Sequence, residues 1–189
     1  MKKTVWTFGL ISGAIISILM AATIPFQDEL GFDHSLVVGY TTMVLAFLLI
    51  YFGVRSYRDN VAGGSVRFGR AFAVGALIAV ISSVCYVATW EVIYFKFMPD
   101  FLTKYQAHQL EKARADGATE AVLAKQKVDM DRIAKMYKNP VINSAMTLVE
   151  PLPVGLLIAL VSAAILSRAK KSDVAGTTGR ARGMTSEVI

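Results

Sequence analysis

Cysteine and histidine are scarce in this chain of 189 residues. Its single cysteine, Cys85, cannot form a disulfide within the chain or supply the cysteine set of a structural zinc site. The two histidines, His34 and His108, lie far apart in the sequence, and neither has a partner at metal-ligand spacing. We therefore expect no metal site and no cofactor, and we interpret both histidines as solvated loop residues.

Charged residues are also few. They make up 18% of the chain, against about a quarter in ordinary soluble domains, and hydrophobic residues make up 54%. Because the apolar residues are gathered in long blocks, the composition excludes a soluble globule, a disordered chain and a fibrous repeat. The net charge of +6 would suggest a nucleic-acid partner for a soluble protein. Here the positions of the basic residues explain it better, and we expect no nucleic-acid binding.

Four apolar blocks are each long enough to cross a bilayer, which needs roughly 20 helical residues. They occupy residues 4–26, 35–54, 71–95 and 141–167. The first two contain no charged residue, the third contains only Glu91, and the fourth contains only Glu150. A β-barrel would show shorter segments in which apolar and polar residues alternate, and these blocks do not have that pattern. The sequence thus predicts an all-α membrane protein with four transmembrane helices.

The first block has an alternative interpretation as a signal peptide, because it follows Lys2 and Lys3. However, its apolar run is longer than the hydrophobic region of a signal peptide, and residues 20–23 offer no good cleavage site. We expect it to remain as the first span.

Basic residues flank these blocks in a pattern that predicts orientation. Lys2 and Lys3 precede the first block, and further basic residues follow the fourth, at positions 168, 170, 171, 180 and 182. The connection between the second and third blocks carries four arginines, namely Arg55, Arg58, Arg67 and Arg70. These flanks hold more than half of the 20 Lys and Arg residues, whereas the first connection has none. By the positive-inside rule we expect both termini in the cytoplasm. We interpret the four arginines as contacts for anionic lipid headgroups.

The long connection, about residues 99–138, is rich in good helix formers. It predicts a helix over 101–115 and a second over 119–137, with Asp116-Gly117 as the break and Thr119 as the cap. The second helix has an apolar face made of Leu123, Met130, Ile133, Ala134 and Tyr137. We expect an external helical hairpin between the third and fourth spans. Residues 1–171 would form the membrane domain, and 172–189 a disordered cytoplasmic tail.

Several short segments carry a family resemblance. They are the Gly-rich first span, Tyr57-Arg58-Asp59, Ser65-Val66-Arg67-Phe68, Phe97-Met98-Pro99-Asp100-Phe101, Tyr137-Lys138-Asn139-Pro140 and Glu150-Pro151-Leu152-Pro153-Val154-Gly155. With them, residues 2–171 resemble the bacterial membrane family called domain of unknown function 4199. The resemblance implies a four-span protein of the bacterial inner membrane, and it implies no activity.

Small residues recur every four positions in three spans. The ladders are Gly9, Gly13, Ser17 and Ala21; Ala71, Gly75, Ala79 and Ser83; and Gly155, Ala159, Ala163 and Ser167. In lipid, such faces let helices approach closely. We favour packing within the bundle, and the alternative is a homodimer or a partner helix.

Glu91 and Glu150 are the candidate site residues, because an ionisable group inside a span suggests a functional site. Each lies roughly 27–32 Å from the cytoplasmic edge, so the two share one depth and could line one outward-facing pocket. Asn139, Asn143 and Thr147 precede Glu150 at helical spacing and form a polar stripe with it.

Two prolines follow this stripe directly. Pro151 and Pro153 have no N–H, so the carbonyls of Thr147 and Val149 lose their helical partners and need another donor, a water or a cation. The alternative is structural, with Glu150 held by backbone N–H groups at a helix N-terminus.

The aromatic residues near the ends of the third span, such as Trp90 and Tyr94, are typical of an interfacial belt. The sequence has no catalytic constellation, no HExxH and no nucleotide-binding fingerprint. We therefore do not expect an enzyme, with an unrecognised lipid-modifying activity as the remaining exception.

Two hypotheses of function remain. The first is a non-enzymatic accessory or structural membrane protein, whose outer hairpin contacts a membrane protein partner, an envelope protein or the outer leaflet. The second is a small transporter or ligand-binding protein with an acidic pocket at Glu91, Glu150, Asn143 and Thr147.

Overall fold

The computed structural model describes residues 1–167, apart from the side chains of residues 27–30. Its long helices are α1 (Lys2–Thr23), α2 (Gln27–Asn60), α3 (Phe68–Val92) and the pair α6 (Pro140–Leu148) and α7 (Pro151–Leu166). Four segments, 2–26, 31–60, 68–97 and 140–166, are long and apolar enough to cross a membrane. No strand occurs in the described residues. The predicted four-span, all-α fold is confirmed, and the predicted tail, 172–189, lies outside the described residues.

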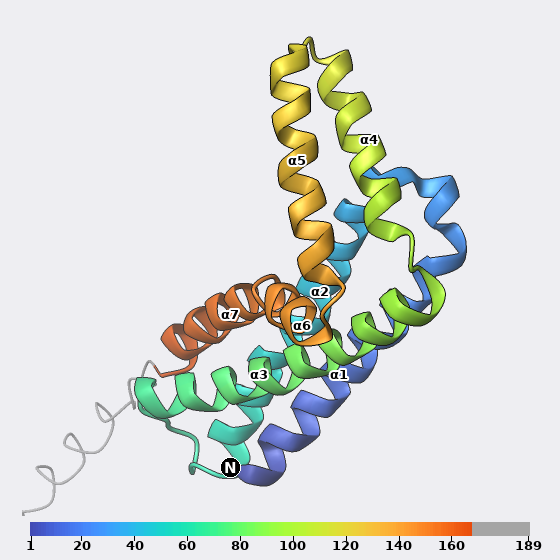
Figure 1. Ribbon diagram of the computed structural model, residues 1–189. Coiled ribbons are helices and arrows are strands. Elements are labelled where there is room, and N and C mark those ends of the chain that lie inside the picture. Colours follow the sequence, from blue (N-terminus) through green and yellow to red (C-terminus); the bar gives the residue numbers. More distant parts are fainter. Residues whose placement is uncertain (168–189) are drawn as a thin grey trace, which may run out of the picture.

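Short irregular turns join these helices. A 3-10 turn, η1 (Ile24–Phe26), links α1 to α2, and a π-helical turn, η2 (Ile93–Phe97), extends α3. Near its start, α2 is kinked at Gly31, whose φ of 67° and ψ of 167° suit a residue without a Cβ. This kink lets the beginning of α2 turn toward the neighbouring hairpin (Figure 1).

Helix α3 lies centrally and packs against α1, α2 and α7 (Figure 1). Most residues of the predicted ladders are buried at these contacts, whereas Ala21 is exposed. A Cβ added at Gly13 would come 2.6 Å from the Cys85 sulfur, and one added at Gly155 would come 2.8 Å from the Ala79 Cβ. Because nothing larger than glycine fits there without movement, these positions serve close packing inside the bundle.

Buried hydroxyl groups add polar contacts between the same helices. Ser12 Oγ on α1 donates to the Ala46 carbonyl on α2 at 2.9 Å, and Ser82 Oγ on α3 donates to the Gly9 carbonyl at 3.2 Å. Each such bond adds roughly 0.6 kcal/mol in a membrane bundle. They fix the rotation of α1 relative to its neighbours.

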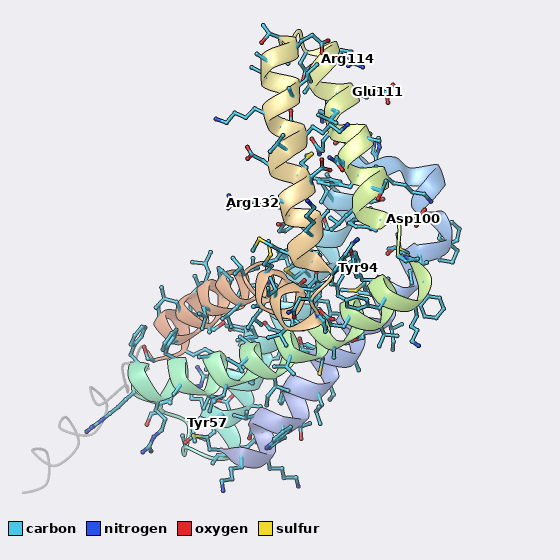
Figure 2. All side chains as sticks on the ribbon, viewed as in Figure 1. Tyr57, Tyr94, Asp100, Glu111, Arg114 and Arg132 are labelled. Atoms are coloured by element: carbon cyan, nitrogen blue, oxygen red, sulfur yellow. The ribbon has the colours of Figure 1, made fainter. Side chains whose placement is uncertain are left out.

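Helices α4 (Phe101–Ala115) and α5 (Glu120–Tyr137) form an antiparallel hairpin that projects from one end of the bundle (Figure 1). Gly117, with a φ of 85°, makes the turn between them. Glu111, Arg114 and Arg132 lie along the projecting part (Figure 2). Hereafter, this end is the hairpin side, and the opposite end, with Met1 and the loop 61–67, is the terminal side.

Helix α6 begins with a well-formed cap. The Asn139 side chain accepts hydrogen bonds from the N–H groups of Val141, at 3.0 Å, and Ile142, at 3.4 Å. We expect Asn139→Ala to lower the free energy of unfolding by about 1 kcal/mol, because it leaves these donors without a partner. Thermal unfolding in detergent measures this. Asn60→Ala is the control, since that side chain bonds only to Ser56 at the exposed end of α2, and an equal loss in both variants would contradict the prediction.

Candidate functional site

A cavity of about 650 Å³ lies where the hairpin meets the bundle, a size typical of small-molecule sites. Residues from six helices, α1 to α6, line it, together with the short segment before α7. Its aromatic lining comprises Phe32, Tyr40, Tyr86, Trp90, Phe101, Tyr105 and Tyr137. Among the described residues that line it, Glu150 alone has a charged side chain. The cavity is thus an apolar and aromatic space with one carboxylate.

Glu150 lies at the break between α6 and α7 and faces this cavity. Its Oε2 accepts a hydrogen bond from the Tyr86 hydroxyl on α3 at 3.0 Å. No backbone N–H caps onto its side chain, so the structural alternative proposed from the sequence, a carboxylate held at a helix N-terminus, is wrong. A tyrosine from another span positions this carboxylate instead.

The break itself follows the sequence prediction at Pro151 and at the Thr147 carbonyl. Pro151 does begin a new helix, as a residue without an N–H should. The Thr147 carbonyl accepts the backbone N–H of Glu150 at 3.2 Å. For this oxygen, the predicted need for another donor is therefore met by a backbone N–H of the tight turn.

Glu91 does not line the cavity. Its Oε1 accepts a hydrogen bond from the Ser144 hydroxyl on α6 at 2.9 Å. Glu91 follows Tyr86 by five residues, which rotates it by roughly 140° around α3 from the cavity wall. The structure therefore does not bring Glu91 and Glu150 together in this pocket, although their depths are similar.

The polar stripe of α6 is divided between two roles. Thr147 lines the cavity, whereas Asn143 is buried and does not. The Asn143 amide donates to the Tyr137 carbonyl at 3.3 Å, and its Oδ1 accepts from Thr147 Oγ1 at 3.1 Å. Asn143 thus joins α6 to the end of the hairpin, and Thr147 alone of this pair can meet a ligand.

One wall of the cavity forms where the start of α2 contacts α4. The Phe32 ring lies 5.6 Å from the ring of Tyr105 and 5.2 Å from that of His108, measured between centroids. His108 is half-buried in a helix, so its interpretation as a solvated loop residue is wrong. Beyond the rings, Lys112 pairs with Asp33 at 3.0 Å, and this contact raises the pKa of Lys112.

Sequence reasoning missed this wall because its members lie about 70 positions apart and belong to segments interpreted separately. The feature of the sequence that could have indicated this wall is the group of aromatic residues at 101–108, which lies outside the predicted belt. Tyr94, assigned to that belt, packs instead against Tyr137 of α5, with ring centroids 5.8 Å apart. Figure 2 places Tyr94 at this junction of the bundle and the hairpin.

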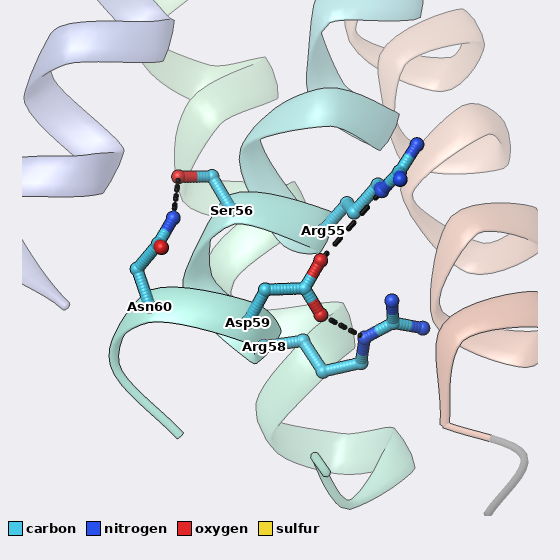
Figure 3. A network of polar contacts seen from close by, with 5 residues as sticks. All are labelled: Arg55, Ser56, Arg58, Asp59 and Asn60. Atoms are coloured by element: carbon cyan, nitrogen blue, oxygen red, sulfur yellow. Dashed lines mark hydrogen bonds and ion pairs between the residues drawn. The ribbon is translucent and has the colours of Figure 1, made fainter. Parts of the chain in front are cut away.

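The four candidate headgroup arginines lie on the terminal side, away from the cavity. Asp59 pairs with Arg58 at 2.7 Å and with Arg55 at 3.6 Å (Figure 3). Arg67 and Arg70 are exposed at the start of α3. The carboxylate of Asp59 therefore offsets part of the positive charge of Arg55 and Arg58, and contact of the four arginines with lipid headgroups stays a prediction.

The fold and this pocket define a helical, multi-pass membrane protein with a cavity at one end of its bundle. In the part of the chain that the structure describes, no three His, Cys, Asp or Glu side chains gather as metal ligands. The chain belongs to the family described as protein of unknown function (DUF4199), whose model matches residues 7–168. Comparison with curated proteins and with solved structures found no match.

Proposed function

We propose that this protein is a non-catalytic, ligand-binding membrane protein that takes a small amphipathic molecule into the cavity beside the hairpin. The single observation that carries the proposal is the cavity itself, with apolar walls and one carboxylate. This is the second hypothesis from the sequence with a revised site. Glu150, Tyr86, Tyr40 and Thr147 replace the predicted pairing of Glu91 with Glu150.

The depth of the cavity supports an amphipathic ligand. Helix α7 has 16 residues and spans roughly 24 Å from Pro151 to the terminal side. Glu150 therefore lies near the hairpin-side boundary of a hydrocarbon core about 30 Å thick. A ligand with its polar group at Glu150 and its apolar part among Ile16, Met20 and Met43 would match both environments.

We further propose that the protein lies in a bacterial inner membrane with both termini in the cytoplasm. The exposed Arg67 and Arg70 on the terminal side support this orientation. The hairpin and the cavity would then face the outer leaflet, and the ligand would enter from that leaflet or from the space outside it.

Filling the cavity tests the proposal. Gly39 lines it, and a Cβ added there meets no atom within 4 Å. Gly39→Phe should therefore place a ring in the cavity without disturbing the packing of α2. Native mass spectrometry of protein released gently from its own membrane should show a bound small molecule in the wild type. In the variant, the occupancy of that molecule should fall about tenfold or more.

The control is Gly69→Phe, at a glycine near the start of α3 that also has open space around it. This variant should keep the bound mass, since Gly69 does not line the cavity. Equal occupancy in wild type and both variants, or no bound molecule in any of them, would overturn the proposal.

The accessory hypothesis keeps one specific observation in its favour. Val122 and Met136 of α5 are exposed and share one side of the helix, because the 14 positions between them make about four turns. An apolar side on a projecting hairpin suits contact with a protein partner or a membrane surface. A co-purifying protein that persists in Gly39→Phe would favour this role over ligand binding.

A further inference from the structure

We infer that the polar group recognised in this cavity is an organic cation, an amine or a quaternary ammonium, carried by an amphiphile. The inference rests on the proposed function and names its ligand class. Its first support is charge. Glu150 supplies the cavity's negative charge, and in the described residues no Lys, Arg or His forms an ion pair with it. A carboxylate near a membrane boundary is stabilised by a cation, and the ligand is the group placed to provide one.

The second support is the aromatic wall. Tyr86 and Trp90 lie one turn apart on α3, and Tyr40 lies on the opposing helix α2 near the Glu150 carboxylate. The Trp90 ring is held by an edge contact with Phe101, with centroids 5.1 Å apart. Ring faces attract ammonium groups, so aromatic rings that line the same cavity as a carboxylate suit a quaternary ammonium.

The composition of the wall also distinguishes an organic cation from a metal ion. Ca²⁺ takes six to eight oxygen ligands, and Mg²⁺ demands six. Besides Glu150 and the tyrosine hydroxyls, the side-chain oxygens of this wall come from Thr23, Ser35, Thr42 and Thr147, which are neutral and spread over three helices. Such a wall suits a diffuse organic cation better than a small, strongly hydrated ion.

The chain contains its own reporter for the test. It has two tryptophans, Trp90 in the cavity wall and Trp6, which is 55% exposed on the terminal side. A Trp6→Phe background leaves Trp90 as the sole tryptophan. In dodecyl maltoside micelles, decyltrimethylammonium should change the Trp90 emission with saturation. Decyl sulfate, of equal chain length, should bind at least about tenfold more weakly, because its charge is repelled by Glu150.

Two carboxylate variants locate the charge. Glu150→Gln should weaken binding of decyltrimethylammonium about tenfold or more. Glu91→Gln is the matched control, because Glu91 has a similar depth but lies outside the wall, and it should leave binding unchanged. A second pair of variants, at Tyr40, provides a test that does not depend on whether Glu150→Gln folds. Tyr40→Leu should weaken binding of the cation about fivefold by removing a ring face, whereas Tyr40→Phe should keep it.

The outcomes separate this inference from the proposed function. If both amphiphiles bind equally, Gly39→Phe abolishes both, and Glu150→Gln changes neither, the cationic ligand is overturned and the binding cavity stands. If neither amphiphile changes the Trp90 emission with saturation, and native mass spectrometry finds no bound molecule, both are overturned.

Discussion

Replacing Gly75 by leucine is expected to lower the free energy of unfolding by about 3 kcal/mol, at the upper end of what overpacking costs. Gly75 lies in the middle of α3, where a Cβ would come 2.9 Å from the Ala159 Cβ and 3.2 Å from the Ala159 Cα on α7. Since one of these atoms belongs to the backbone, the clash cannot be relieved by a side-chain rotation alone. Helix α7 would have to move away from α3.

Thermal unfolding in detergent measures this effect. Gly69→Leu is the matched control, in the same helix, with no atom within 4 Å of an added Cβ. Both changes remove a glycine of α3 and add the same side chain, so the variants differ chiefly in what the added side chain meets. The prediction is contradicted if the two variants lose the same stability, because the loss would then come from leucine itself and not from the α3 and α7 contact.

The four spans could be predicted because a membrane leaves a strong mark on sequence. The hydrocarbon core demands about 20 apolar residues in a row, and charged residues are rare among them whatever the tertiary packing. The ends of α2 were harder to predict. The predicted span covered 35–54, whereas α2 runs from Gln27 to Asn60. Its polar ends, including Asp33 and Arg58, extend beyond the apolar stretch, so hydropathy alone marks only its central part.

The hairpin helices could be located for a different reason, namely local chemistry. The predicted ranges 101–115 and 119–137 lie close to α4 and α5, because Gly117 makes the turn and Pro140 starts the next helix. The predicted apolar face of α5 was harder to interpret. Leu123 is buried where the two hairpin helices pack, and Ile133 and Tyr137 line the cavity. Periodicity showed that these residues share a face without showing what covers it.

The candidate site could be predicted only in part. Glu150 was identified because a carboxylate in an apolar block is unusual, and it lines the cavity. Glu91 satisfied the same criterion, but it does not line the cavity. Depth along a span can be read from residue counts, but rotation around the helix axis depends on which faces the other spans occupy. The cavity also needs Phe32 and Tyr105, whose proximity depends on the kink at Gly31.

That kink leads to the second large expected effect. Phe32→Ala should release the hairpin from α2, because Phe32 makes ring contacts with Phe101, Tyr105 and His108 at centroid distances of 5.9, 5.6 and 5.2 Å. Truncating a half-buried phenylalanine removes roughly 2 kcal/mol of contact energy, less than in a full core. The remaining ion pair between Asp33 and Lys112 is exposed and contributes little.

Hydrogen exchange detects the released state. Amides of α4 should exchange about 30-fold faster in Phe32→Ala, the factor that corresponds to 2 kcal/mol of easier local opening. Phe26→Ala is the control, since Phe26 lies on the same side of the bundle but is 54% exposed. Unchanged exchange in α4, or equal acceleration by both variants, would contradict a specific role for Phe32.

The same release bears on ligand binding. Phe101, Leu102 and Tyr105 of α4 form part of the cavity wall, and the Phe32 contacts hold them against the bundle. If the hairpin completes the binding site, Phe32→Ala should both accelerate exchange in α4 and weaken binding of the cationic amphiphile, because a wall that opens more often contributes less. Faster exchange with unchanged binding would instead assign recognition to the four spans alone, and would leave the hairpin free for a partner.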